Sequence, residues 1–402
     1  MNIIDLRKFH YELNNIIKYN KDFIIFSSPG NEEEPYKRYF YKYDICNKDI
    51  YRINHNAIET WYYRMKKCYV SNEFIYTNSY IKIDNKYQTI IHKINMLNGN
   101  VEKVYASEKD FEVYFLNDKY VLLIGSNYKI DEEHSDYQKD IEGDYEYAIL
   151  HDLNSGDKYE VKDRRIALGI RDYFITYEFQ EEAYIVFEEA YMEDWELEDL
   201  YDRKIKKESF YKNGYRESIN IITIEKFIDA IKNEYYIIPF DFSYKTELTA
   251  WTRYFGMDDR NVYFRVKDFE THIQHIYSVD KKTMEKKLLK SIAMESNLDK
   301  YSYYNIWSEL KNKRIYERKQ INNDDKIIIR EIFPDAFVYE YSEMNESFTE
   351  LFGEYVITVF WTEDENGDNY KDFVRLRNIK DGTEKLFEGI YEIIDDNLIL
   401  FN

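Results

Sequence analysis

One local pattern recurs along the whole chain and limits the folds that it can adopt. Each copy is a short polar turn, then an aromatic or aliphatic residue, then two or three residues that favour β-strands. Neighbouring copies are 40 to 53 residues apart, except for one interval of 89 residues. The anchors of the copies are Phe23, Phe74, Tyr120, Tyr173, Val262, Ile315, Tyr355 and Leu398. A unit of roughly 40 to 50 residues has the length of one four-stranded antiparallel sheet with its turns.

A hairpin follows most copies, as a strand, a polar turn of two to four residues and a returning strand. The turns are Asn47-Lys48-Asp49, Asn98-Gly99-Asn100, Asn154-Ser155-Gly156-Asp157, Asp280-Lys281-Lys282 and Lys380-Asp381-Gly382. Their glycines supply the positive φ that tight hairpins need. The sequence therefore predicts an all-β chain of short antiparallel strands.

The order of a polar turn, an "IAF"-like strand and an "LYxYDLxTG"-like strand and turn resembles the repeat of TolB-type propellers. The Ser-Pro-Asp-Gly turn of that repeat is absent, since Ser71-Asn72-Glu73 and Leu116-Asn117-Asp118 stand in its place. The Trp-Asp and Gly-His signatures of WD40 repeats are absent too. The resemblance implies a β-propeller of four-stranded antiparallel blades and leaves the subfamily open.

Eight anchors give seven full intervals and one copy left over, which favours seven blades, with six or eight as alternatives. The leftover copy is interpreted as a terminal strand that closes the ring against the N-terminal blade. The main structural alternative is a pair of β-sandwich domains, but a similar unit throughout residues 20–402 favours a single propeller domain.

The first residues show a different period. Apolar residues at three- and four-residue steps predict an amphipathic helix over residues 1–19 that caps or flanks the β structure. These residues are Ile3, Leu6, Phe9, Leu13, Ile16 and Ile17.

The interval of 89 residues carries about 40 residues beyond one repeat unit. We place the surplus as a charged insertion at about residues 180–220, followed by Ile224, Phe227, Ile228 and Ile231 at the spacing of a short helix. Insertions in propellers project from one face and often bind partners. The predicted partner-binding residues are Trp195, Glu193, Glu196, Glu198, Lys204, Lys206 and Lys207. Trp195 has the setting of an interface anchor, and the alternative is that it packs the insertion on its own scaffold.

Charge and cysteine content narrow the classes of partner. With 56 Lys and Arg against 77 Asp and Glu, the net charge of -21 repels nucleic acid. The two cysteines, Cys46 and Cys68, cannot make a disulfide framework or a CxxC metal site. No apolar run of signal-peptide or membrane-span length occurs, which predicts a cytoplasmic chain without a membrane partner.

No catalytic or cofactor-binding motif is found, and we predict no cofactor. The weak metal candidates are Asp364, Asn366, Asp368 and Asp372, which offer oxygen ligands at calcium-like spacing. Gly367 and Arg375 depart from the EF-hand pattern, so a solvated acidic turn is the favoured interpretation. His272 and His275 are three apart on a predicted strand and therefore face opposite sides of it.

These observations favour a non-enzymatic protein–protein interaction or scaffold protein that uses the propeller loops and the charged insertion to bind another protein. The alternative is a carbohydrate-binding or glycoside-cleaving propeller that uses acidic and aromatic residues on its central face. The sequence singles out no catalytic pair among its many carboxylates.

Overall fold

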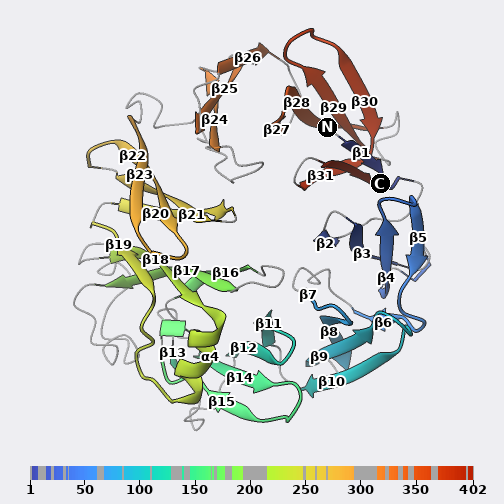
Figure 1. The fold of residues 1–402 in the computed structure, drawn as a ribbon, viewed down its shortest axis with the longest axis vertical. Helices are drawn as coiled ribbons and strands as arrows, with labels where there is room; N and C mark the ends of the chain where they lie inside the picture. The colour runs from blue at the N-terminus through green and yellow to red at the C-terminus, as the bar shows by residue number, and fades with distance from the viewer. Residues whose placement is uncertain are drawn as a thin grey trace. The chain divides into compact units, whose positions relative to one another are not determined.

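The fold is that of a computed structural model of the chain (Figure 1). Its described residues are mostly β, with four-stranded antiparallel sheets and the short helix α4 (Ile224–Lys232). None of the helices in this part of the chain has the length and apolar character needed to cross a membrane. The structure describes residues 2–7, 15–19, 22–29, 33–34, 36–60, 68–83, 86–108, 111–127, 138–139, 145–163, 165–166, 170–176, 183–192, 215–247, 250–258, 260–268, 270–293, 315–321, 326–333, 338–342, 348–363, 370–394 and 397–401.

The chain forms two compact units, and the first contains residues Asn14–Thr252. In its sheets most strands pair with the next strand in sequence, except that β12 pairs with β14 and that β6 pairs with β4. The first sheet contains β2 (Asn15–Tyr19), β3 (Phe23–Pro29), β4 (Lys37–Asp44), β5 (Asp49–Arg52) and β6 (Ile58–Glu59), and the second contains β7 (Cys68–Val70), β8 (Phe74–Ile83), β9 (Lys86–Asn95) and β10 (Val101–Ser107). The third contains β11 (Phe111–Phe115), β12 (Tyr120–Asn127), β13 (Gln138–Lys139), β14 (Tyr145–Asp152) and β15 (Lys158–Glu160), and the fourth contains β16 (Ile170–Thr176), β17 (Tyr184–Met192), β18 (Tyr215–Thr223) and β19 (Phe242–Lys245).

The second unit joins Met1–Leu13 to Arg253–Asn402. Its sheets repeat the antiparallel arrangement, apart from one parallel pair. The first sheet contains β20 (Ala250–Met257), β21 (Asn261–Asp268), β22 (Ile273–Asp280) and β23 (Lys286–Ala293), and the second contains β24 (Ile315–Ile321), β25 (Lys326–Phe333) and β26 (Val338–Ser342). The third contains β27 (Phe348–Phe352), β28 (Tyr355–Glu363), β29 (Tyr370–Asn378) and β30 (Glu384–Glu388). The fourth contains β31 (Ile390–Ile394), β32 (Asn397–Phe401) and β1 (Asn2–Asp5).

The five predicted hairpins are confirmed, and they share one turn geometry. In each turn an Asp or Asn carbonyl accepts a hydrogen bond from the amide four residues later, and that later residue has positive φ. The residues with positive φ are Lys48 (58°), Gly99 (68°), Gly156 (81°), Met284 (57°) and Gly382 (71°). Glycine therefore occupies the position of positive φ in three of these turns. In the other two, the position is occupied by Lys48 or Met284, whose backbone is strained there.

We expect Lys48→Gly and Met284→Gly each to raise the free energy of unfolding by about 0.5–1 kcal/mol, because glycine removes the steric cost of the left-handed conformation. The matched reverse change is Gly156→Ala, where an added Cβ meets no atom within 4 Å and only the backbone strain is introduced. Urea unfolding of the full chain measures both. A loss of stability in the two glycine variants would contradict the expectation.

The recurring pattern is confirmed as a strand signal, and its place in the sheet varies. Most anchors lie on the second strand of their sheet, as Phe23 does on β3 and Tyr120 does on β12. Tyr173 and Ile315 instead lie on the first strands β16 and β24. The pattern of a polar residue, an aromatic residue and β-formers identifies a strand without fixing its place in the sheet.

The predicted N-terminal helix over residues 1–19 is wrong. Asn2–Asp5 forms β1, which pairs in parallel with β32, and Asn15–Tyr19 forms β2, which pairs with β3. Ile4, outside the predicted helical stripe, is buried, as is Leu6, whose amide donates to the Leu400 carbonyl. A short helix is stable only when its apolar face is packed, and pairing with β32 and β3 places these residues in sheets instead. The leftover copy of the repeat, on β32, pairs with β1 inside the segment predicted to be helical, and not with the strands β2 to β6 of the predicted N-terminal blade.

The predicted bounds of the insertion, about 180–220, are also wrong. Tyr184–Met192 and Tyr215–Thr223 are the paired central strands β17 and β18, and the connection between them is 193–214. Glu188, Glu189 and Glu217 look like surface charges in the sequence, yet all three are buried within this sheet. The predicted short helix is confirmed as α4, and it follows β18 at the end of the sheet opposite to the 193–214 connection.

Candidate functional site

The residues that the sequence predicts to bind a partner lie outside the described residues. They are Trp195, Glu193, Glu196, Glu198, Lys204, Lys206 and Lys207, all in the connection 193–214. Their role stays a prediction, now attached to the hairpin between β17 and β18.

Three of the weak metal candidates, Asp364, Asn366 and Asp368, lie outside the described residues as well. Asp372 is an exposed residue of β29, where its carbonyl accepts a hydrogen bond of 2.7 Å from the Gly389 amide. In the part of the chain that the structure describes, no group of three or more His, Cys, Asp or Glu residues is placed to hold a metal ion.

An apolar segment after α4 is the most distinctive described surface. Tyr235, Tyr236 and Ile237 are consecutive, and 48%, 73% and 68% of their respective surfaces are exposed. We call these three residues the aromatic loop. Single exposed apolar residues are ordinary, whereas grouped ones mark interaction sites. The aromatic loop is therefore the candidate functional site.

Helix α4 gives the aromatic loop a fixed base. The Thr223 hydroxyl caps the helix by accepting a hydrogen bond of 3.3 Å from the Lys226 amide. The inner face of α4 packs into a core shared by two sheets, and Figure 1 shows the helix beside β14 and β15. The Phe227 ring lies 5.6 Å from the ring of Phe187 on β17. The buried helix residues are Ile224, Phe227, Ile228, Ala230 and Ile231.

A Schellman motif ends α4 and begins the aromatic loop. The Tyr235 amide donates to the Ala230 carbonyl at 3.0 Å, and the Glu234 amide donates to the Ile231 carbonyl at 2.9 Å. Glu234 has a φ of 56°, in the left-handed region where glycine is usual. Strained residues of this kind persist where the surroundings hold them. The loop is thus set at a defined angle to the helix.

The other end of the aromatic loop is held by a buried ion pair. Asp163 accepts two hydrogen bonds from the Arg165 guanidinium, at 3.0 and 2.7 Å, one of 3.1 Å from the Arg165 amide and one of 2.7 Å from the Ile238 amide. Arg165 in turn donates to the Ile238 carbonyl at 3.1 Å and lies over the Phe240 ring. Ile238 is buried in the core. The exposed residues are therefore clamped on both sides and preorganised for contact.

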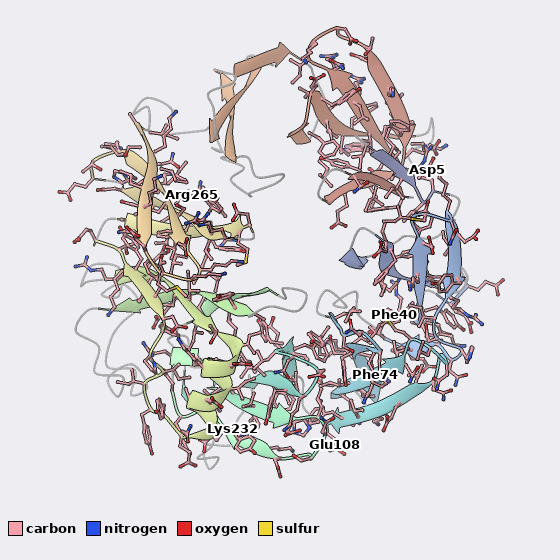
Figure 2. The ribbon with its side chains drawn as sticks, viewed as in Figure 1. Asp5, Phe40, Phe74, Glu108, Lys232 and Arg265 are labelled. Carbon is pink, nitrogen blue, oxygen red and sulfur yellow. The ribbon has the colours of Figure 1, made fainter. Side chains whose placement is uncertain are left out.

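The charges around the aromatic loop differ in how they are used. Lys162 pairs with Glu160, and Lys226 pairs with Asp241. Lys232, labelled at the end of α4 in Figure 2, lies over the rings of Tyr120 and Tyr159. The exposed carboxylates Glu225, Asp229 and Glu234 form no ion pair with any residue that the structure describes. The loop is thus bordered by carboxylates that are available to a partner.

Two polar side chains elsewhere in this unit, those of Glu189 and Cys68, have structural roles. Burial raises the pKa of Glu189, which accepts hydrogen bonds from Ser218 at 3.1 Å and from Asn220 at 3.0 Å. Burial also raises the pKa of Cys68 to about 12, so its thiol, hydrogen-bonded to Thr77, is not a nucleophile at neutral pH. Both side chains are satisfied within the fold.

Sequence reasoning missed the aromatic loop because Tyr235-Tyr236-Ile237 has the composition of a strand or a core segment. A signal was present. The apolar triplet directly follows the predicted helix and precedes Pro239, where helix C-caps and turns are common. Exposure at such a position depends on the neighbouring sheets.

Comparisons with known proteins concern the fold. No protein-family model and no curated protein matches the chain. The β-propeller domain of the Trilobed protease from Pyrococcus furiosus matches 91% of this chain and 92% of that chain, at 11% identity and a TM-score of 0.41. An oligogalacturonate lyase in complex with manganese matches 91% and 85%, at 9% identity and a TM-score of 0.38. TolB from Acinetobacter baumannii matches 96% and 82%, at 10% identity and a TM-score of 0.28.

The structural neighbours of this chain are thus β-propellers, the class that the repeat resembles. The repeated four-stranded antiparallel sheets are those of a repeat protein of this class. The similarity assigns no subfamily.

Proposed function

We propose that this chain is a non-enzymatic interaction protein and that the aromatic loop anchors another protein. The observation that supports the proposal is the combination of exposure with rigidity in Tyr235, Tyr236 and Ile237. Keeping such side chains in water gives up burial worth about 1.5–3 kcal/mol for an apolar side chain of this size. A partner that covers them recovers this free energy with little ordering cost.

Tyrosine is one of the residue types that dominate binding energy at protein interfaces. A tyrosine offers a large flat apolar area and a hydroxyl at its tip, so it contacts both apolar and polar groups. The carboxylates Glu225, Asp229 and Glu234 beside the loop resemble the polar rim of an interface.

The test begins with capture of proteins from a lysate of the source cells by the full chain. Each identified partner is then purified, and its affinity for the native chain and for the variants is measured by calorimetry. We expect the triple variant Tyr235→Ser, Tyr236→Ser, Ile237→Ser to lose about 30-fold in affinity or more, the scale of an interface hot spot. The matched control is Tyr51→Ser with Leu97→Ser, which removes exposed apolar side chains (47% and 88%) elsewhere in the same unit. Equal binding by the triple variant and the native chain would refute the proposal.

We also propose that the connection 193–214, with Trp195 and its neighbouring charges, makes a second contact with a partner. Its support is the composition of that segment and its place on the β17–β18 hairpin. Replacing 193–214 by an Asn-Gly turn leaves both strands intact, which a deletion of 180–220 would not do. If the replacement leaves the affinity for the partner unchanged, the connection 193–214 does not contact that partner.

The arrangement of the sheets as blades is part of the same proposal. The described strands form eight separate sheets, so we propose a single propeller of eight blades, with β31, β32 and β1 as the blade that joins the two ends of the chain. The support is the repeated antiparallel meander and the pairing of the first strand with the last. Class averages from electron microscopy that display six or seven blades would refute this number.

A further inference from the structure

We infer that the partner of the aromatic loop is a protein with a basic surface, in which Lys or Arg side chains border an apolar pocket. This inference rests on the proposed function and adds the chemistry of the partner. It is carried by the charges beside the loop, by the tyrosine rings and by the total charge of the chain.

The available charge beside the loop is negative. Glu225 and Asp229 are four residues apart on the exposed side of α4, and Glu234 directly precedes Tyr235. None of these three carboxylates has an ion pair among the described residues. Lys162 pairs with Glu160 and also interacts electrostatically with Glu234 and Tyr236, Lys226 pairs with Asp241, and Lys232 lies over two tyrosine rings. An incoming partner therefore meets two carboxylates, those of Glu225 and Asp229, that pair with no lysine among the described residues.

The side chains of the loop itself suit the same partner. The face of a tyrosine ring attracts a guanidinium or ammonium group, and a carboxylate next to it forms a charge-assisted hydrogen bond with that group. Tyr235 and Tyr236 are exposed, so their rings are open to such a group. Ile237 adds an apolar contact for a pocket in the partner.

A second copy of this chain fits poorly on the aromatic loop. Two copies would each bring a net charge of -21 to the interface, and like charges oppose association. The same negative charge opposes a nucleic acid.

The experiment uses the full chain with Ile237 replaced by the photocrosslinking amino acid p-benzoylphenylalanine as the probe. The probe is irradiated in a lysate of the source cells, and the crosslinked protein is identified by mass spectrometry and purified. We expect it to be basic and to bind the native chain with a Kd that rises about tenfold when salt is raised from about 0.05 to about 0.3 M.

Neutralising the carboxylates tests the contact itself. We expect the double variant Glu225→Gln, Asp229→Asn to weaken binding about tenfold, mainly through a slower association rate, and to reduce the salt dependence. The matched control, Glu73→Gln with Glu102→Gln, removes the same charge from exposed positions elsewhere in the unit and should leave the Kd within about twofold.

The outcomes separate the two proposals. If the serine variants of the aromatic loop lose binding while the neutralised variant and salt change nothing, the loop binds a partner but the basic surface is refuted. A crosslink to a second copy of this chain, or to an acidic protein, also refutes the basic partner. If the serine variants bind as the native chain does, the proposed function itself fails.

Discussion

Phe187→Ala should lower the free energy of unfolding of the unit that holds the aromatic loop by about 3–5 kcal/mol. Phe187 is fully buried on β17 and joins the sheet to the two segments that flank the loop. Its ring lies 5.6 Å from Phe227 on α4 and 5.5 Å from Phe240. Truncation removes the ring and leaves a cavity between β17, α4 and the segment at Phe240. Both segments that flank the loop then lose their contact with β17.

The measurement is urea unfolding of the full chain, followed by tryptophan fluorescence and circular dichroism. Phe187→Leu is the matched control, because it keeps most of the apolar volume and should cost less than about 1.5 kcal/mol. The alanine variant should also weaken partner binding under conditions where it is still folded, since α4 and the segment at Phe240 lose their common contact. A loss of stability below about 1 kcal/mol would show that Phe187 is not the centre of this core.

The parts of the fold that the sequence predicts well are set by local chemistry. The hairpin turns need positive φ at one position, and Gly99, Gly156 and Gly382 supply it within a few residues of the Asn or Asp that starts each turn. Helix α4 is similar, since its apolar residues face one side and Thr223 caps it. Both signals are complete within a short stretch of sequence.

The parts that the sequence predicts wrongly depend on distant partners. β1 is stabilised by β32, almost the whole length of the chain away, and the local apolar period of residues 1–19 carries no trace of that pairing. Glu188, Glu189 and Glu217 appear as surface charges because a single sequence does not reveal their partners. Glu189 is satisfied by Ser218 and Asn220 across the sheet, and Glu217 accepts a hydrogen bond of 2.7 Å from the Thr252 amide.

The same contrast between local signals and distant partners applies to the candidate site. The sequence predicts a binding segment from the charged composition around Trp195, which lies outside the described residues. It does not predict the aromatic loop, because whether Tyr236 is buried or exposed depends on the clamp between Asp163 and Ile238, 75 residues apart in sequence. Composition finds unusual segments, whereas exposure of an ordinary apolar segment is a property of the tertiary structure.

Acid should destabilise the unit of residues 14–252 through its buried histidines. Burial, helped by the ammonium of Lys103, lowers the pKa of His92 from its ordinary 6.5 to about 4. The folded chain therefore binds fewer protons than the unfolded chain between these two values. The stability is fully present above pH 6.5 and is lost as the pH falls toward 4, by about 2–3 kcal/mol for His92.

His151 acts in the same direction at another place in this unit. It is buried on β14 with its ring 4.7 Å from that of Tyr105 on β10, and burial lowers its pKa, with a smaller effect from Lys158. Protonation of either histidine puts a positive charge into a mostly buried contact and next to a lysine. The two effects add as long as the sites do not share partners.

Urea unfolding at pH values from 7 to 4 tests this pH dependence, with His92→Gln as the decisive variant. Glutamine can still hydrogen-bond the Ser79 hydroxyl, which lies 2.9 Å from His92 Nε2, but it cannot take up a proton. The difference in unfolding free energy between the native chain and His92→Gln should therefore change by about 2–3 kcal/mol over this range. The matched control is His275→Gln, since His275 makes a similar 2.9 Å contact with Ser291 in an exposed setting. If the native chain and His92→Gln lose stability in parallel, burial of His92 is not what makes the fold sensitive to acid.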